Sequence, residues 1–345
     1  MMRVLKFIGW VIVALMTAGV AYQQFSAARD RADFPPPGEL VDIGGRKLHI
    51  WCLGEETGNP TVILEGGFTF IASGWERVMK PLAAKTRVCA YDRAGYGWSD
   101  EDFGPRYGVD HVNDLKALRE ATDMRTPFIF VGHSLGGMLG RIYYDHYPDD
   151  MAGLVMIEPA DPEIILQEFE AEDGEPTERR SGQKGCPVKC TLATIVTELG
   201  VTRLMMGNVP FLDDPGYSQA AIAAYKARMS RSPNVRAMLR LGRYIGTIFH
   251  ETADNKTLGD LPVMVIYGTG AGSVFGDSET EEDRLLDLEV NKAAWGKTTA
   301  TSSRDFGVVE MDADNHLAII AHEDSANAVA QEIIRLIDAI AAPAE

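Results

Sequence analysis

The hydrophobic and polar positions of this chain follow two alternating patterns between residues 40 and 341. Short apolar runs bounded by turn residues are typical of strands buried on both faces of a parallel sheet. Segments with apolar residues at three- and four-residue spacing separate them and predict amphipathic helices. Candidate strands lie at 61–64, 87–91, 128–131, 153–157, 262–267 and 305–311. The sequence therefore predicts an α/β fold with a mostly parallel sheet wrapped by helices.

Two further patterns complete the predicted organisation. Candidate strands at 40–43 and 47–53 flank Gly44 and Gly45, which predicts a hairpin. From residue 162 to residue 255 no convincing strand occurs, and only helical patterns are present. We therefore expect a core of two parts with a helical insertion between them. The predicted segments are 34–161 (core, first part), 162–255 (insertion) and 256–345 (core, second part).

The first 33 residues form a different kind of segment. Arg3 and Lys6 precede an uncharged run at 7–26, whose apolar part is 7–22. That length is slightly short for a membrane-spanning helix and slightly long for the core of a signal peptide. We expect residues 1–33 to lie outside the fold as an uncleaved membrane anchor, with the body periplasmic or extracellular. A cleaved signal and a secreted body are the alternative. Membrane contact is expected through this segment only.

Composition and cysteine content narrow the possible partners. A net charge of −17 argues against nucleic acid, whose phosphates would be repelled. Cys186 and Cys190 could close a small disulfide loop in an oxidising compartment. Zinc is the competing interpretation, and it is weakened because no second Cys or His pair lies nearby at ligand spacing. Cys52 and Cys89 each fall in a candidate strand, as buried thiols or as a disulfide.

One motif carries candidate chemistry. The candidate strand at 128–131 runs into Gly132-His-Ser-Leu-Gly136, and a helical pattern follows. This is G-x-S-x-G between a strand and a helix, where the turn exposes the hydroxyl of Ser134. Glycines at 132 and 136 let the two backbones approach closely. Ser134 is therefore a candidate nucleophile, with an ordinary glycine-rich turn as the alternative.

A serine nucleophile requires a base within hydrogen-bond reach, and histidine suits this task near neutral pH. Of the seven histidines, His316 follows the last candidate strand, and His322 is the runner-up. His133 lies inside the motif itself, and we expect its side chain to point away from Ser134.

These elements resemble the α/β-hydrolase fold over nearly all of residues 40–341. The matching features are a glycine-rich turn after the third strand, G-x-S-x-G after the fifth, helices after the sixth and a late histidine. The segment 92–100 (DRAGYGWSD) also resembles the loop after the fourth strand in many single-domain esterases. The resemblance implies an eight-stranded, mostly parallel sheet with a helical cap inserted after strand six. It also implies that Cys52 and Cys89 lie on neighbouring strands, which makes a bridge between them possible.

The resemblance extends to a catalytic triad in which His316 occupies the family's position for the base. The acid usually follows the seventh strand, but the first acidic residue there is Asp277. Some members place it after the sixth strand, where Glu158 lies, and Asp161 is a further candidate. Glu158 or Asp161 could instead cap the first helix of the cap. The preferred acid is Glu158, with Asp277 as the alternative.

The resemblance also implies two oxyanion donors, the N–H of Leu135 after the nucleophile and the N–H of Phe68 after the third strand. Gly67 matches a family glycine, whereas Glu65 and Gly66 depart from the usual histidine. Apolar cap residues could line an acyl pocket or pack the cap onto the body. They are Ile164, Ile165, Leu166, Phe169, Leu204, Met205, Met206, Ile245 and Phe249.

We therefore expect a serine hydrolase that cleaves carboxylic esters with an apolar acyl or alcohol part through an acyl-enzyme. Ser134 excludes the epoxide-opening chemistry that other members perform with an aspartate, because a serine ether could not be hydrolysed back. No cofactor and no metal are expected, since no phosphate loop, dinucleotide fingerprint or ligand cluster occurs. A lactonase, thioesterase or cofactor-free perhydrolase could use the same triad. A non-catalytic binding domain is the alternative of another class, and Ser134 and His316 argue against it.

Overall fold

The computed structural model describes residues 1–173, 187–206, 219–254, 257–270, 280–313 and 315–342. Within them, eight strands form one sheet in the order β1-β2-β4-β3-β5-β6-β7-β8. The strands are β1 (Glu39–Asp42), β2 (Lys47–Leu53), β3 (Val62–Glu65), β4 (Val88–Tyr91), β5 (Phe128–His133), β6 (Met151–Ile157), β7 (Val263–Gly268) and β8 (Asp305–Met311). β2 pairs antiparallel with β1 and β4, and the remaining pairs are parallel. The predicted fold class is confirmed.

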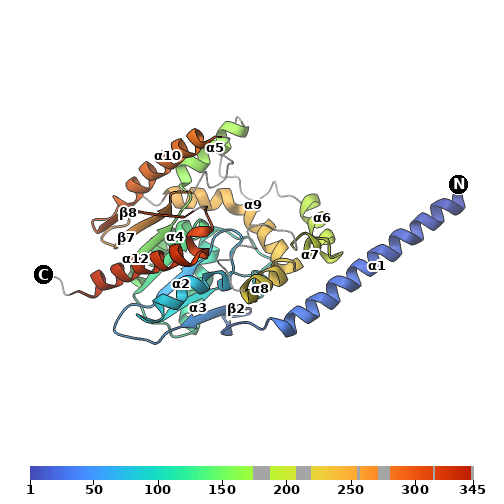
Figure 1. The fold of residues 1–345 in the computed structure, drawn as a ribbon, viewed down its shortest axis with the longest axis horizontal. Helices are drawn as coiled ribbons and strands as arrows, with labels where there is room; N and C mark the ends of the chain where they lie inside the picture. Colours follow the sequence, from blue (N-terminus) through green and yellow to red (C-terminus); the bar gives the residue numbers. More distant parts are fainter. Residues whose placement is uncertain (174–186, 207–218, 255–256, 271–279, 314, 343–345) are drawn as a thin grey trace.

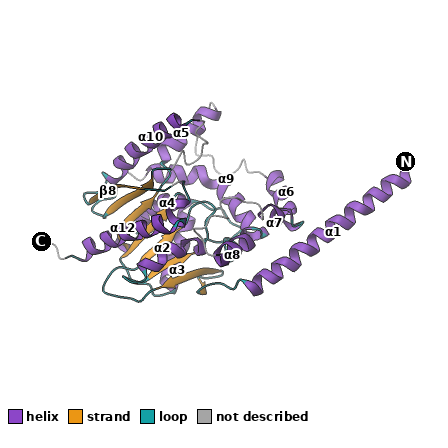
Figure 2. Ribbon diagram, viewed as in Figure 1, coloured by secondary structure: helices purple, strands orange, loops and turns teal. Residues whose placement is uncertain are grey.

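Helices cover both faces of the sheet (Figures 1 and 2). α2 (Glu76–Leu82), α11 (Ala318–Ala321) and α12 (Glu323–Ala341) pack on one face. α3 (Gly108–Ala121), α4 (Leu135–His146) and α10 (Glu281–Thr299) pack on the other. Side chains of β5 alternate between the two layers: Phe128 and Phe130 enter one core, and Ile129 and Val131 enter the other. Burial on both sides explains why this strand is apolar without interruption.

The segment between β6 and β7 is mainly helical in its described part, as the sequence predicts. It contains α5 (Pro162–Asp173), α6 (Pro187–Glu198), α7 (Val201–Met206), α8 (Gln219–Met229) and α9 (Ser232–Asp254). We call these helices the cap. α9 contacts both the body helices α3 and α4 and the cap helices α5, α6 and α8, so it joins the two.

The apolar cap residues do not share one environment. Ile165 and Phe249 are buried, whereas Leu204 and Met205 on α7 are about two thirds exposed. The sequence predicts that these residues either line a pocket or pack the cap onto the body. Neither role fits Leu204 and Met205. The side chain of Phe169 lies outside the described residues.

The N-terminal segment differs from expectation. α1 (Met2–Asp33) is one continuous helix that projects from the body, and by length and composition it could span a membrane, as a signal sequence also could (Figure 1). Its second half belongs to the fold, because Gln23, Ala27 and Asp30 are buried and α1 contacts α6 and α8. These residues are four and three apart and therefore share one face of the helix. The prediction that residues 1–33 lie outside the fold is wrong for this half.

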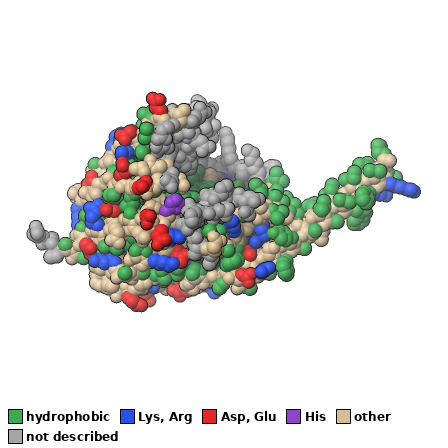
Figure 3. All heavy atoms as spheres, viewed as in Figure 1, with side chains coloured by type: hydrophobic (Ala, Val, Ile, Leu, Met, Phe, Trp, Pro, Cys, Tyr) green, Lys and Arg blue, Asp and Glu red, His purple; other side chains and the backbone are tan. Residues whose placement is uncertain are grey.

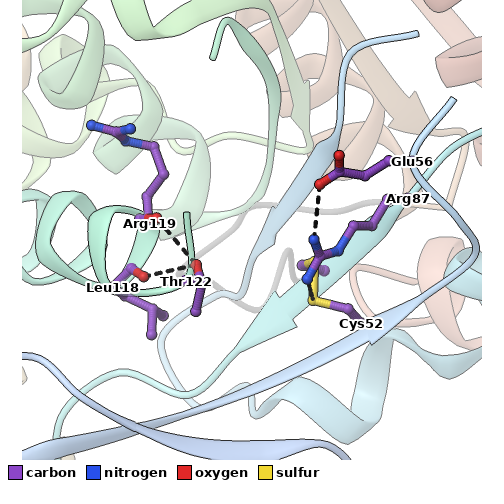
Figure 4. Close-up of a disulfide and its surroundings, with 7 residues drawn as sticks. Cys52, Glu56, Arg87, Leu118, Arg119 and Thr122 are labelled. Atoms are coloured by element: carbon purple, nitrogen blue, oxygen red, sulfur yellow. Dashed lines mark hydrogen bonds and ion pairs between the residues drawn. A yellow bond between two sulfur atoms is a disulfide. The ribbon is translucent and has the colours of Figure 1, made fainter. Parts of the chain in front are cut away.

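Cys52 and Cys89 form a disulfide between β2 and β4, where they are directly paired in the strand register. Arg87 lies beside the bridge and donates to Glu56 at 3.0 Å (Figure 4). The possibility left open by the sequence is thus realised for this pair. Cys186 and the side chain of Cys190 lie outside the described residues.

The disulfide should stabilise the body measurably. The double variant Cys52→Ala with Cys89→Ala is expected to lower the free energy of unfolding by about 3 to 4 kcal/mol, because the bridge closes a long loop and restricts the unfolded chain. Urea denaturation of parent and variant measures this difference. In the presence of a reducing agent, the two proteins should unfold at the same urea concentration. A difference that persists under reduction would mean that lost packing, not the bridge, is responsible.

Candidate active site

The predicted site residues meet at one edge of the sheet. Ser134 follows β5, Glu158 follows β6, Gly268 ends β7, and His316 follows β8. β5, β6, β7 and β8 are neighbours in that order and run parallel, so their carboxyl ends lie side by side. The carboxyl edge of a parallel sheet is where α/β proteins usually bind ligands.

The turn that carries Ser134 has the strained geometry expected of the motif. Ser134 has a φ of 54° and a ψ of −120°, which a non-glycine residue rarely adopts. A Cβ added to Gly132 would lie 2.2 Å from the backbone of Gly136, and one added to Gly136 would lie 2.4 Å from the carbonyl oxygen of Glu65. Strand, turn and helix are therefore packed too tightly for any side chain at these two positions.

His316 is hydrogen-bonded to Glu158. The distance from Nδ1 of His316 to Oε2 of Glu158 is 2.6 Å. The Glu158 side chain is fully buried, whereas that of His316 is 30 % exposed. The second carboxylate oxygen, Oε1, accepts a hydrogen bond of 2.8 Å from the N–H of Gly268. Because a carboxylate only accepts, Nδ1 of His316 carries a hydrogen and Nε2 is the nitrogen left to take a proton.

The other candidate acids do not share this contact within the described residues. Oδ1 of Asp161 accepts the N–H groups of Glu163 and Ile164, so Asp161 caps α5. Asp277 lies outside the described residues. A Cβ on Gly268 would lie 2.9 Å from Oε1 of Glu158. The carboxylate from β6 therefore occupies the space in which a side chain at the end of β7 would lie.

His133 supports the loop that carries His316. Its Nε2 donates to the carbonyl oxygen of His316 at 2.8 Å, and its ring packs against Phe70 and Trp75. Burial, followed by the nearby His316, lowers the pKa of His133 well below its usual value. His133 is therefore neutral. The sequence predicted that its side chain points away from Ser134 but did not predict this bond. His322 immediately precedes α12.

His133, Glu158 and His316 lie close enough to one another to be considered as metal ligands. The hydrogen bonds argue otherwise. Nε2 of His133 needs its hydrogen to bond a carbonyl, and Nδ1 of His316 needs its hydrogen to bond Glu158. The carboxylate is also engaged at both oxygens. We interpret the cluster as a hydrogen-bonded network, and not as a metal centre.

A buried ion pair fixes the turn after β3. Arg93 donates to Oε1 of Glu65 at 2.5 Å and to the carbonyl oxygens of Gly66 and Gly67 at 2.7 and 2.5 Å. Burial alone would lower the pKa of Arg93, but Glu65, Tyr96 and Tyr91 together outweigh this effect and raise the pKa. The guanidinium therefore stays charged. In the sequence Glu65 is recognisable only as a departure from the family pattern, although an acid that ends an apolar strand signals a buried partner.

This arrangement orients the backbone N–H of Phe68. A peptide group is planar and trans, so a Gly67 carbonyl held by Arg93 turns the Phe68 N–H in the opposite direction. The turn is next to the nucleophile candidate, since a Cβ on Gly67 would lie 3.2 Å from the Cβ of Ser134. Leu135 is the first residue of α4, where an N–H has no acceptor within the helix. Within the described part of the chain, neither N–H has a hydrogen-bond acceptor.

Comparisons with known proteins agree with this fold. A sequence model of the α/β-hydrolase fold matches residues 60–182. A 2-hydroxy-6-oxo-2,4-heptadienoate hydrolase of Pseudomonas putida is 32% identical over 124 residues, covering 35% of this chain and 44% of that protein. The chain spans less than half the length of the curated relatives it matches, from 18% to 46%.

Solved structures resemble nearly the whole chain. An epoxide hydrolase from Vigna radiata has a TM-score of 0.63 at 17% identity, covering 87% of this chain and 97% of that one. A thioesterase domain from the curacin biosynthetic pathway has a TM-score of 0.58 at 17% identity, with 86% and 98% covered. The chain therefore has the α/β-hydrolase fold.

The glycine contacts at the turn lead to a stability prediction. Gly132→Ala should lower the free energy of unfolding by roughly 2 kcal/mol or more, because the added methyl group meets backbone that cannot move aside. Gly296→Ala in α10 is the control, since a Cβ there meets nothing within 4 Å. This control should gain roughly 0.5 to 1 kcal/mol. Equal effects in urea denaturation would contradict the tight packing of the turn.

Proposed function

We propose that this protein is a serine hydrolase that cleaves carboxylic esters through an acyl-enzyme. Ser134 is the nucleophile, His316 the general base, and Glu158 the carboxylate that orients and stabilises the imidazole. The observation that carries the proposal is the His316–Glu158 hydrogen bond at the same sheet edge as the strained Ser134 turn. An isolated serine in a glycine-rich turn would need neither partner.

The proposed reaction begins when Oγ of Ser134 attacks the ester carbonyl carbon while Nε2 of His316 takes its proton. Glu158 holds Nδ1–H and stabilises the resulting imidazolium. The N–H groups of Phe68 and Leu135 stabilise the carbonyl oxygen as it becomes negative, which contributes roughly 3 kcal/mol for each donor. His316 then returns the proton to the departing alcohol. Water activated by the same histidine releases the acid and restores the serine.

The serine at position 134 distinguishes acyl transfer from epoxide opening. If Ser134 opened an epoxide, the product would be an alkyl ether, which this machinery could not hydrolyse. An acyl-serine is an ester and can be released by water. The likeness to an epoxide hydrolase therefore extends to the fold, and the identity of residue 134 favours acyl transfer.

The nucleophile is tested with a fluorophosphonate probe, which reacts with activated serines. We expect the parent protein to be labelled and Ser134→Ala not to be. Ser303→Ala, at an exposed serine beside β8, is the control and should label as the parent does. Absence of labelling in the parent, or labelling that survives Ser134→Ala, would reject the proposed nucleophile.

The acid is tested by Glu158→Gln, which keeps the shape of the side chain but removes the charge. We expect kcat for a p-nitrophenyl ester to fall by roughly 10³- to 10⁴-fold, by analogy with loss of the triad carboxylate in serine proteases. Asp277→Asn is the matched comparison and should keep nearly the activity of the parent. The reverse pattern would assign the acid to Asp277.

A further inference from the structure

α1 is attached to the cap by specific polar contacts. Nε2 of Gln23 donates to the carbonyl oxygen of Ser230 at 2.9 Å, and Arg203 on α7 pairs with Asp30 at 2.7 Å. Nε of Arg203 also donates to Oε1 of Gln23 at 3.1 Å. These contacts are buried or partly buried, and they join α1 to α7 and to the turn between α8 and α9. The position of α1 relative to the cap is therefore defined.

The contact continues into the apolar part of α1. A Cβ on Gly19 would lie 2.7 Å from the carbonyl oxygen of Leu199, and one on Gly200 would lie 2.8 Å from the ring of Tyr22. Gly200 also has a φ of +78°, which favours glycine. The turn between α6 and α7 thus rests directly on residues 19–22. These residues belong to the uncharged run at 7–26.

This contact sets the height of the cap relative to a bilayer. Twenty helical residues, such as 7–26, span about 30 Å, which matches the hydrocarbon core of a membrane. Gly19 precedes the end of the run at Ser26 by a distance of about 10 Å. If α1 spans the bilayer, the α6–α7 turn therefore lies at or below the membrane boundary.

The helices on both sides of that turn expose apolar side chains. On α6, Leu192 and Ile195 are three residues apart, and on α7, Val201, Leu204 and Met205 are three and four apart. Each set therefore lies on one helix face. Their side chains are 39% to 65% exposed. We call these five residues the α6–α7 apolar face. It adjoins the exposed hydrophobic side chains that cover α1 in Figure 3.

We propose that the α6–α7 apolar face rests in the lipid bilayer beside α1, and that the active site takes a membrane-resident lipid ester. The occupant is lipid because the face is continuous with a helix long and apolar enough to span a membrane. The net charge of −17 argues against attraction to anionic lipid as the driving force. Burial of apolar side chains supplies it instead.

The rest of the cap connects this face to the site. The hydroxyl group of Tyr225 on α8 donates to the carbonyl oxygen of Thr69, directly after the Phe68 turn. On α9, a Cβ at Gly242 would lie 3.5 Å from the ring of Phe68. The cap therefore lies between the proposed bilayer contact and the turn after β3 that carries Phe68. The substrate class rests on the proposed function, whereas the docking face does not.

The docking face is tested without catalysis. The full chain carrying Ser134→Ala is reconstituted in phosphatidylcholine vesicles that contain a diazirine-bearing phosphatidylcholine, and lipid adducts are mapped by mass spectrometry. We expect adducts on residues 7–22 and on 192–205. Leu285, Leu286 and Val290 on α10 are similarly exposed and serve as the internal control. Equal labelling of α10, or none on α6–α7, would overturn the proposal, as would cross-links joining α7 to a second copy.

A kinetic experiment tests the substrate class. The double variant Leu204→Glu with Met205→Glu should hydrolyse methylumbelliferyl oleate in vesicles at about one tenth of the parent's rate or below, because carboxylates are poorly tolerated in lipid. The same variant should hydrolyse soluble methylumbelliferyl acetate at the rate of the parent. Leu285→Glu with Leu286→Glu should change neither rate.

The two proposals fail in different ways. An equal loss of rate on both esters would show that the α6–α7 apolar face supports the structure of the cap. It would overturn the proposal that the substrate comes from the membrane. A parent protein that hydrolyses neither ester would reject the proposed function and the substrate class with it, while the adduct pattern would still decide the docking face.

Discussion

The site depends on one carboxylate that reaches across the end of a neighbouring strand. Glu158 ends β6 and His316 follows β8, so β7 lies between them in the sheet. The Glu158 side chain crosses that gap because β7 ends in Gly268, which has no side chain and donates its N–H to the carboxylate. The cost is a Glu158 φ of 44°, a strain of about 1 to 3 kcal/mol. Among the described residues, three non-glycine residues have positive φ, and two of them are Ser134 and Glu158.

The turn after β3, which lies beside Ser134, is fixed by another buried charged group. The Arg93 guanidinium binds Glu65 and the carbonyl groups of Gly66 and Gly67 in the turn after β3, all within the protein interior. A buried ion pair adds little net stability, because desolvation offsets its attraction. Its effect here is geometric, since it sets the direction of a backbone N–H before any substrate arrives. Fixed donors of this kind avoid reorganisation during the reaction.

The fold could be predicted from sequence because strands buried on both faces leave a clear apolar signal and helices leave another. The positions of Ser134 and His316 followed from motif and chain order. The acid partner of His316 could not be chosen from the sequence. The contact between Glu158, after β6, and His316, after β8, depends on the space that Gly268 leaves open, and no local pattern records that space. The docking of α1 was missed for a related reason. The buried face of its second half consists of Gln23, Ala27 and Asp30, which resembles a solvated surface until its partner Arg203 is known.

The disulfide bears on which leaflet the cap would meet. A disulfide such as Cys52–Cys89 persists in oxidising compartments and is rare in the cytosol, which favours a body on the outer side. Flanking charge does not decide the direction of α1, because Arg3 and Lys6 precede the uncharged run and Arg29 and Arg31 follow it. If the body lies on that side and α1 spans the bilayer, the contacts between the second half of α1 and the cap set the cap against the leaflet on the oxidising side. A lipid ester drawn from the bilayer would then come from this leaflet alone.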